Sequence, residues 1–332
     1  MMGSGMAAIY RKGVVTMHSI DTKRQGPCTA VSFTFVILTA FLLLWGGSAA
    51  AGTGQRHFAT PEDAVAELVG AVRMNDTGHL LAIFGAAGRD LVVSGDETLD
   101  REARDRFLTA YEEKNRLEKV SNKKAVLHVG EDDWPMAIPI VRTGRTWRFD
   151  TKQGRQEILA RRIGRNELAA IQVCLAYVDA QREYAQRQRN SVLEYAQRFA
   201  SDPGKDNGLC WDADEKENPA SPMGPLVARA CRTGFTPGCR DEAAPYHGYF
   251  YRILTAQGKD APGGAYDYIV NGRMIGGFGL VAYPARYRST GVMTFIVNHD
   301  GIVYQKDLGK NTVKIAETMG VFNPDPTWKK VE

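Results

Sequence analysis

The chain of 332 residues carries 42 lysines and arginines against 38 aspartates and glutamates, and 44% of it is hydrophobic. The length is sufficient for two compact domains, and the composition is ordinary for folded protein. Neither disorder nor a solenoid is indicated. The first 51 residues hold four basic residues and one acid, leaving 38 basic against 37 acidic residues. A net charge near +1 gives no global attraction to nucleic acid or to anionic membranes.

Residues 1–51 have the order of a secretory signal. A basic stretch leads into the uncharged run AVSFTFVILTAFLLLW, and small residues that suit cleavage follow in GGSAAAG. Met17 is an alternative start that gives the leader a normal length. The competing interpretation is a retained anchor in the inner membrane, since the run is only slightly shorter than the ~20 residues that span a bilayer. We favour cleavage and expect a periplasmic or extracellular protein.

Residues 58–160 are predicted to form an α+β domain. Thr60, Pro61 and Asp63 mark a helix start, with Thr as the N-cap and an acid three residues later. A second short helix ends near Phe84, and a third runs through DREARDRFLTAYEEKNRL. Strands are predicted in KAVLHVG, MAIPIVRTG and TWRFDT from their β-branched and aromatic alternation.

This order of helices and strands, closed by GRTWRFDT, resembles the nuclear-transport-factor-2-like superfamily. The resemblance implies a cone between helices and sheet that is often a ligand or active-site pocket, commonly with a His or an Asp inside. His79 and His128 are the candidate histidines. From the residues alone we expect both to be surface or half-buried side chains, because a fold does not define pocket chemistry.

Residues 165–201 are predicted to form the longest helix, because this stretch contains neither Gly nor Pro, and the helix is expected to bend or break near Asn190. Its apolar stripe is formed by Leu168, Ile171, Leu175 and Val178. Residues 202–244 are rich in Gly, Pro, Asn and Asp and are predicted to be irregular. The acids of this segment suggest a calcium site, but they lack the spacing of an EF-hand loop. A solvated loop is therefore favoured. The acids are Asp202, Asp206, Asp212, Asp214 and Glu215.

Residues 245–322 alternate strands with turns and predict an antiparallel sheet on which the long helix packs. Turns are expected at Asn271-Gly272, at Gly276-Gly277 and, within GVMTFIVNHDGIVYQKDLG, at Asp300-Gly301. A two-residue turn at the last pair exposes His299 at the bend, without a metal or catalytic role.

Four cysteines follow the signal, an even number that favours disulfides in an exported chain. Cys231 and Cys239 flank the turn-rich RTGFTPG, which predicts a local disulfide worth roughly 2 to 3 kcal/mol. Pairing of Cys174 with Cys210 then follows by elimination. Zinc is not expected, because no C-x-x-C pair occurs and His247 has no matching partner.

Long stretches of the chain, among them RRIGRNELAAIQ, NPASPMGPLVARA and YPARYRSTGVMTFIVNHDGIVYQKDLG, are similar to a bacterial family known as domain of unknown function 2950. The resemblance covers most of the mature chain and implies an exported, envelope-associated protein, with no activity to carry over. The stretch from YPARYRST to GIVY is also similar to type IV pilin heads, which implies the head fold. It departs from pilins because another domain separates the signal from the helix.

Two functions are compatible with these residues. The first is a non-catalytic binding or assembly module for an envelope protein or a cell-wall component. The second is a periplasmic hydrolase with a pocket around His247 and Tyr249, using Asp267 and Ser289 as further members of a triad. No G-x-S-x-G occurs, and the Gly-rich APGGAY and IGGFG do not fit a phosphate loop. We therefore favour the binding module and expect no cofactor.

Overall fold

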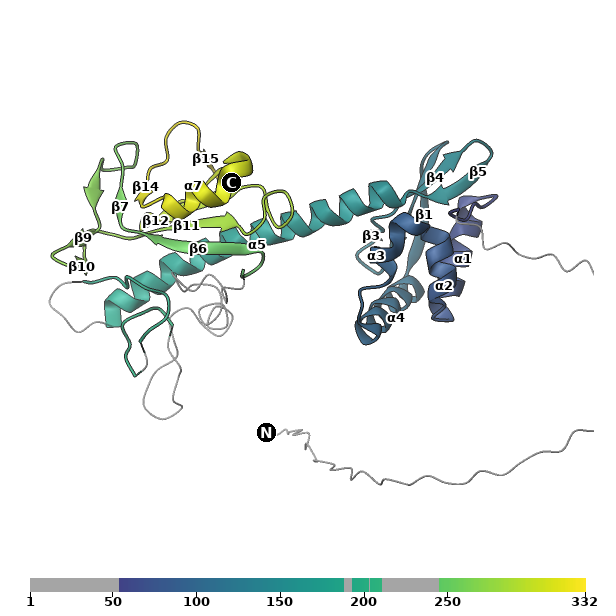
Figure 1. The fold of residues 1–332 in the computed structure, drawn as a ribbon, viewed down its shortest axis with the longest axis horizontal. Helices are drawn as coiled ribbons and strands as arrows, with labels where there is room; N and C mark the ends of the chain where they lie inside the picture. Colours follow the sequence, from purple (N-terminus) through teal and green to yellow (C-terminus); the bar gives the residue numbers. More distant parts are fainter. Residues whose placement is uncertain (1–53, 188–192, 203, 211–244) are drawn as a thin grey trace, which may run out of the picture. The chain divides into compact units, whose positions relative to one another are not determined.

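A computed structural model of the chain describes residues 54–187, 193–202, 204–210 and 245–332 (Figure 1). The predicted signal, residues 1–51, lies outside the described residues, as does most of the predicted irregular segment 202–244. Within the described part of the chain, no helix is both long and apolar enough to cross a membrane.

The N-terminal part combines helices with an antiparallel sheet whose strand order is β1-β2-β4-β5, with β3 paired to β2. Its elements are α1 (Pro61–Arg73), α2 (Thr77–Phe84), η1 (Ala86–Gly88), α3 (Arg89–Val92), α4 (Glu97–Glu113), β1 (Asn115–Ser121), β2 (Lys124–Val129), β3 (Trp134–Pro135), β4 (Ile140–Thr143) and β5 (Thr146–Phe149).

Helix α1 begins where the sequence predicts. The Thr60 hydroxyl accepts from the Asp63 amide at 3.0 Å, and the Asp63 carboxylate accepts from the Thr60 amide at 3.1 Å. This capping box, with Pro61 in the first turn, satisfies amides that the helix leaves free. The third predicted helix is too long, because α4 ends at Glu113 and the residues after it form β1, which pairs with β2.

The long helix α5 (Thr151–Arg187) begins well before the predicted residue 165. The Asp150 carboxylate caps it by accepting from the Gln153 amide at 3.0 Å. The sequence disguises this start, because TWRFDT has the alternation of a strand and Gly154 suggests a break. Gly154 is instead a packing position, since a Cβ there would lie 2.6 Å from Ile138 Cγ1.

Helix α5 ends at Arg187, close to the bend or break expected near Asn190, and described residues 193–201 of the predicted helix are not helical. This segment runs back along α5 and is held by Gln181, which is fully buried. The Gln181 side chain accepts from the Ala196 amide and donates to the Ala196 carbonyl, each at 2.8 Å. A tertiary contact thus overrides a sequence pattern that favours helix.

The C-terminal part is built on an antiparallel sheet of order β15-β13-β12-β11-β6, with a smaller sheet β14-β7-β8 and the hairpin β9-β10. Its elements are β6 (Tyr249–Leu254), β7 (Ala256–Gln257), β8 (Tyr266–Asp267), β9 (Ile269–Val270), β10 (Arg273–Met274), β11 (Gly279–Pro284), β12 (Thr294–Asn298), β13 (Tyr304–Lys306), η2 (Gly309–Asn311), α7 (Thr312–Thr318), β14 (Val321–Phe322) and β15 (Lys329–Lys330).

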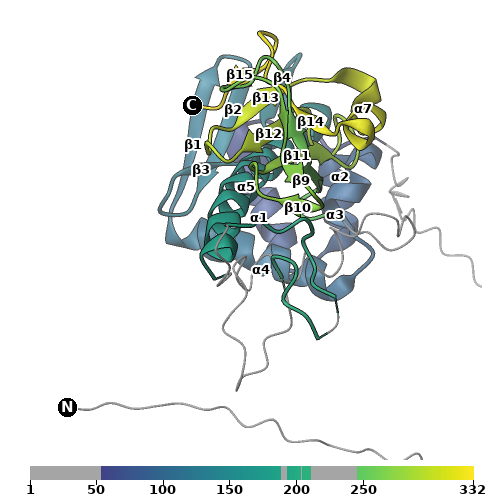
Figure 2. The same ribbon diagram turned by 90° about the vertical axis from the view of Figure 1, so that its left-hand side faces the viewer.

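Strands β11 and β12 are buried on both faces, because α5 covers one face of the sheet and α7 the other (Figures 1 and 2). Successive side chains of a strand point to opposite faces. Leu280 and Val297 therefore join the core with α5, whereas Val281 and Ile296 join the core with α7. The predicted α+β fold, with a long helix packed on an antiparallel sheet, is confirmed.

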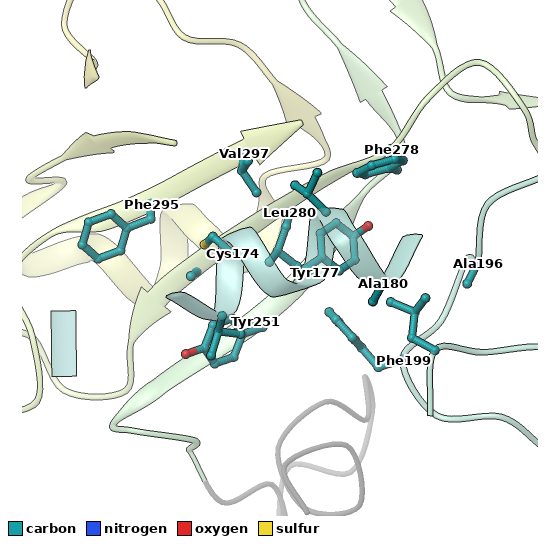
Figure 3. Close-up of a cluster of buried hydrophobic side chains, with 14 of the residues drawn as sticks. Cys174, Tyr177, Ala180, Ala196, Phe199, Tyr251, Phe278, Leu280, Phe295 and Val297 are labelled. Atoms are coloured by element: carbon teal, nitrogen blue, oxygen red, sulfur yellow. The ribbon is translucent and has the colours of Figure 1, made fainter. Parts of the chain in front are cut away.

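Cys174 and Tyr177 form the centre of the face that α5 presents to the sheet (Figure 3). The Tyr177 hydroxyl donates to the Gly279 carbonyl at 3.1 Å, which ties helix to strand. Of the predicted stripe, Val178 belongs to this core and Ile171 packs against it, whereas Leu168 and Leu175 are 66% and 37% exposed. The buried face is centred on Cys174 and Tyr177 beside the predicted stripe, so the predicted stripe is correct only in part.

The predicted Cys174–Cys210 disulfide is wrong, because Cys174 is a free, buried thiol. Elimination failed because it assumed that every cysteine of the mature chain is paired, whereas Cys174 serves as a small apolar side chain in the core. Cys210 is buried, and Cys231 and Cys239 lie outside the described residues. Pairing among these three stays a prediction.

Candidate functional site

The hydrolase interpretation requires His247 to meet Asp267 and Ser289, and the strand register keeps them apart. His247 is exposed just before β6, where Gly248 is hydrogen-bonded to Ala285. Asp267 pairs with Ala256, beyond the far end of β6. At about 3.3 Å per residue, the length of β6 separates His247 from Asp267 by roughly 20 Å. Ser289 therefore has no His-Asp pair to activate it.

Tyr249, the other residue predicted for that pocket, is fully buried. Its hydroxyl donates to the Met293 carbonyl at 2.9 Å. Burial raises the pKa of this hydroxyl above its ordinary value, with the Glu167 charge contributing less. Tyr249 therefore holds the sheet together and does not face a substrate.

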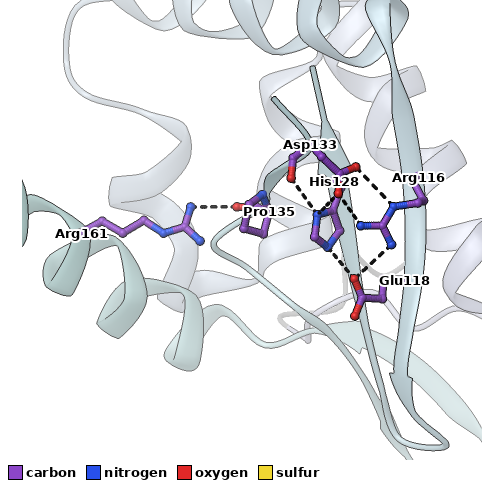
Figure 4. A network of polar contacts seen from close by, with 6 residues as sticks. All are labelled: Arg116, Glu118, His128, Asp133, Pro135 and Arg161. Carbon is purple, nitrogen blue, oxygen red and sulfur yellow. Dashed lines mark hydrogen bonds and ion pairs between the residues drawn. The ribbon is translucent and has the colours of Figure 1, made fainter. Parts of the chain in front are cut away.

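His79 and His128 are half-buried, as the sequence predicted, and both are paired with acids at the surface. His79 Nε2 lies 2.9 Å from Glu67 Oε2. His128 lies in a polar network on β1 and β2, with Nε2 3.0 Å from Glu118 Oε2 and Nδ1 2.9 Å from the Asp133 carbonyl (Figure 4). These contacts occupy both imidazole nitrogens of His128, so the network is structural.

Arg116 connects the two acids of this network (Figure 4). Its guanidinium contacts the carboxylates of Asp133 and Glu118. The hydrogen bond from Arg116 lowers the pKa of Asp133, and the hydrogen bonds to Asp133 and then Glu118 raise the pKa of Arg116. The guanidinium thus bridges the two carboxylates and offsets part of their negative charge.

A cavity of about 210 Å³ lies within the helices of the N-terminal part. It is lined almost wholly by apolar side chains from α1, α2, α3, α4, α5 and the segment between β3 and β4. Leu68, Leu80, Phe84, Phe107 and Ile138 are among them. Neither His79 nor His128 lines the cavity. The histidine that the resemblance to a cone-shaped fold implies for such a pocket is therefore not among its lining residues.

Two charged residues of α4, Asp100 and Arg104, also line the cavity. Arg104 reaches across to Thr77 Oγ1 at 3.0 Å and to the Val92 carbonyl at 3.4 Å, and it also contacts Asn75 Oδ1. It therefore ties α4 to the start of α2 and the end of α3. Sequence reasoning missed this residue, because DREARDRF looks like an ordinary solvated helix face.

His299 is half-buried, and the prediction that it is exposed is wrong. Its ring lies among Tyr268, Phe278 and Gly277, with centroids 5.7 Å and 6.1 Å from the two aromatic rings. The cause is the loop between β12 and β13, which is longer than a two-residue turn and has Gly301 at φ 79°. The His299 ring therefore folds back onto the sheet.

The surroundings of His299 are not those of a general base. Nδ1 is buried and has no hydrogen-bond partner within the described residues. Nε2 faces the Tyr266 hydroxyl at 3.5 Å and Asp300 Oδ1 at 3.9 Å. In a hydrolase triad a carboxylate orients the nitrogen opposite the reacting one. That orienting contact is missing here among the described residues, so no catalytic role follows.

No cluster of three or more His, Cys, Asp and Glu within the described residues could hold a metal ion. Of the acids considered for calcium, Asp202 accepts hydrogen bonds from Arg198 and Asn207 at 2.6 Å and 2.9 Å. Asp212, Asp214 and Glu215 lie outside the described residues.

The model of the family described as protein of unknown function (DUF2950) matches residues 55–331. The chain belongs to this family. No curated protein and no solved structure matches it. The resemblances of its parts to the nuclear-transport-factor-2-like superfamily and to pilin heads therefore stay predictions, and the DUF2950 family brings no activity with it.

Proposed function

We propose that this protein is a non-catalytic binding module that holds an apolar ligand in the cavity beneath α4. The observation that carries the proposal is the cavity itself, which has about 210 Å³ of space and an almost wholly apolar lining. This half-open space is comparable in volume with an enclosed, engineered apolar cavity of about 150 Å³ that binds benzene. An apolar ligand would gain about 0.8 kcal/mol for each methylene that it buries there.

The wall formed by α4 supports entry of a ligand. None of its residues is buried, although Phe107 and Ala103 line the cavity. Its side chains Phe107, Leu108 and Tyr111 are only partly buried against the core, and polar contacts such as Arg73 to Glu112 at 2.8 Å and those of Arg104 add to the attachment of the helix. Because these side chains are only partly buried, the wall leaves the cavity open toward solvent, which supports access of a ligand.

Export to the envelope is part of the proposal and is supported by the leader, with its basic stretch, its apolar run and its small residues. The partner that we expect is an envelope protein or a cell-wall component. Fractionation of cells that produce the full chain tests this, because recovery only in the cytoplasm with the leader intact would refute export.

Binding of the fluorescent probe N-phenyl-1-naphthylamine to the purified protein tests the cavity. Ala103→Trp should abolish the fluorescence increase, because Ala103 is exposed yet lines the cavity and a larger side chain blocks it. Thr109→Trp is the matched control, since Thr109 is exposed on the same helix and does not line the cavity. Equal probe binding by both variants would refute the proposed site.

A further inference from the structure

We propose that the ligand of this cavity is an amphipathic monoanion, with an apolar chain inside and a carboxylate or similar anionic head at Arg104. The inference rests on the proposed function and specifies its ligand. It starts from Arg104, the one cation among the residues that line a mainly apolar space, in which Asp100 is the other charged residue.

The Arg104 guanidinium has only neutral partners in direct contact. Its acceptors are the Asn75 and Thr77 side chains and the Val92 carbonyl. Within the described residues, no carboxylate oxygen lies within 4.0 Å of it. The guanidinium is half-buried at the wall of the cavity, so it can still accept a charged partner. An anionic ligand head would give it a directly contacting carboxylate, through the charge-assisted hydrogen bonds that a guanidinium forms with such a group.

Asp100, one turn earlier on α4, does not fill that place. Its two oxygens accept from the Ser94 amide at 3.0 Å and 3.2 Å. The hydrogen bonds from Ser94, and to a smaller extent the charge of Arg104, lower the pKa of Asp100. Asp100 therefore stays ionised at neutral pH and would repel a second negative charge. The head must reach Arg104 on the side away from Asp100.

Decanoate, decanol and decylamine, all below their micellar concentrations, separate the possible head groups. Each should be measured by displacement of N-phenyl-1-naphthylamine from the purified protein. A charge-assisted hydrogen bond is worth about 1.5–3 kcal/mol, so decanoate should bind at least about tenfold more tightly than decanol. Decylamine should bind most weakly. Within a series of shorter carboxylates, affinity should rise about fourfold for each methylene buried.

Variants of Arg104 and Asp100 test which of these residues sets the preference for an anionic head. Arg104→Gln should lower the ratio of decanoate affinity to decanol affinity about tenfold, whereas Arg104→Lys should keep most of the preference for decanoate. Asp100→Asn should strengthen decanoate binding by removing the repulsion. Unfolding curves of all three variants show whether the fold is retained, and the decanol control reports an intact cavity.

The outcomes distinguish this inference from the proposed function. Equal binding of decanoate and decanol would overturn the anionic head and leave the apolar binding module standing. Preference for decylamine, lost in Asp100→Asn, would overturn the inference in favour of a cationic head. Failure of all three ligands and of the probe to bind would overturn both proposals.

Discussion

Replacing two glycines of α5 by alanine tests where this helix begins and how it packs. Gly164 has no atom within 4 Å of the position that a Cβ would take. Alanine in place of glycine in a helix interior stabilises by about 0.5–1 kcal/mol, so Gly164→Ala should raise the free energy of unfolding by that amount. The gain requires residue 164 to be inside the helix.

Gly154→Ala should do the opposite, although it makes the same chemical change in the same helix. The new Cβ would lie 2.6 Å from Ile138 Cγ1 and 3.1 Å from the Ile138 Cα, and the latter belongs to the backbone and cannot rotate away. Overpacking of this kind costs about 1–3 kcal/mol. That cost is the expected difference between the two variants, with Gly154→Ala the less stable.

Urea unfolding of wild type, both single variants and the combination Gly154→Ala with Ile138→Ala measures these differences. The combination should lose less stability than the sum of the two single variants, because Ile138→Ala removes the nearest atom, Cγ1. Equal stabilisation by the two single variants would mean that α5 does not pack on Ile138. Destabilisation by Gly164→Ala would mean that the helix does not extend through this residue.

Three further predictions concern single side chains. Because Cys174 is fully buried and burial raises the pKa of its thiol, this thiol should react with Ellman's reagent only after unfolding; rapid reaction of Cys174 in the native protein would contradict its place in the core. Arg116→Gln should raise the pKa of Asp133, which the Arg116 hydrogen bond holds low. A lowered carboxyl pKa contributes stability that is lost as the pH falls through it, so the variant should lose that contribution at higher pH; an unchanged Asp133 titration by NMR would contradict the network. Gly301→Val should destabilise by about 1–3 kcal/mol in thermal unfolding, because Gly301 has φ 79°; a neutral result would exclude this loop conformation.

Features encoded by neighbouring residues could be predicted from the sequence. The start of α1 follows from the Thr60 to Asp63 box, which acts within one turn. The hairpin between β9 and β10 follows from Asn271-Gly272, whose φ values of 51° and 78° suit this pair. The alternation of the strands predicted a sheet that packs on the long helix, and the fold class was correct for that reason.

Features that depend on distant contacts could not be predicted in this way. Gly154 belongs in a helix because Ile138 packs against it, and residues 193–201 leave the helix because Gln181 holds Ala196. The cavity is built from separate elements, so no local motif announces it. The role proposed for Arg104 depends on its neutral partners, which lie on other elements and cannot be identified from the sequence around it.

His299 provides a test of whether the last hairpin has a role beyond packing. Its Nδ1 is buried without a partner among the described residues, while its ring packs against Tyr268 and Phe278. Replacing an unsatisfied polar group with an apolar group of similar shape is nearly neutral or stabilising, because no buried hydrogen bond is lost. His299→Phe should therefore equal wild type or exceed it by up to about 1 kcal/mol in urea unfolding.

His299→Ala is the matched control, because it removes the ring and should cost about 1–3 kcal/mol through lost packing. If His299→Phe is instead as destabilising as His299→Ala, the nitrogens rather than the ring carry the stability. Nδ1 must then have a bound partner such as a water molecule, and the tautomer of the imidazole would be set by that partner. Nε2, which faces Tyr266 and Asp300, would in that case be oriented for chemistry, and the case against a catalytic His299 would fail.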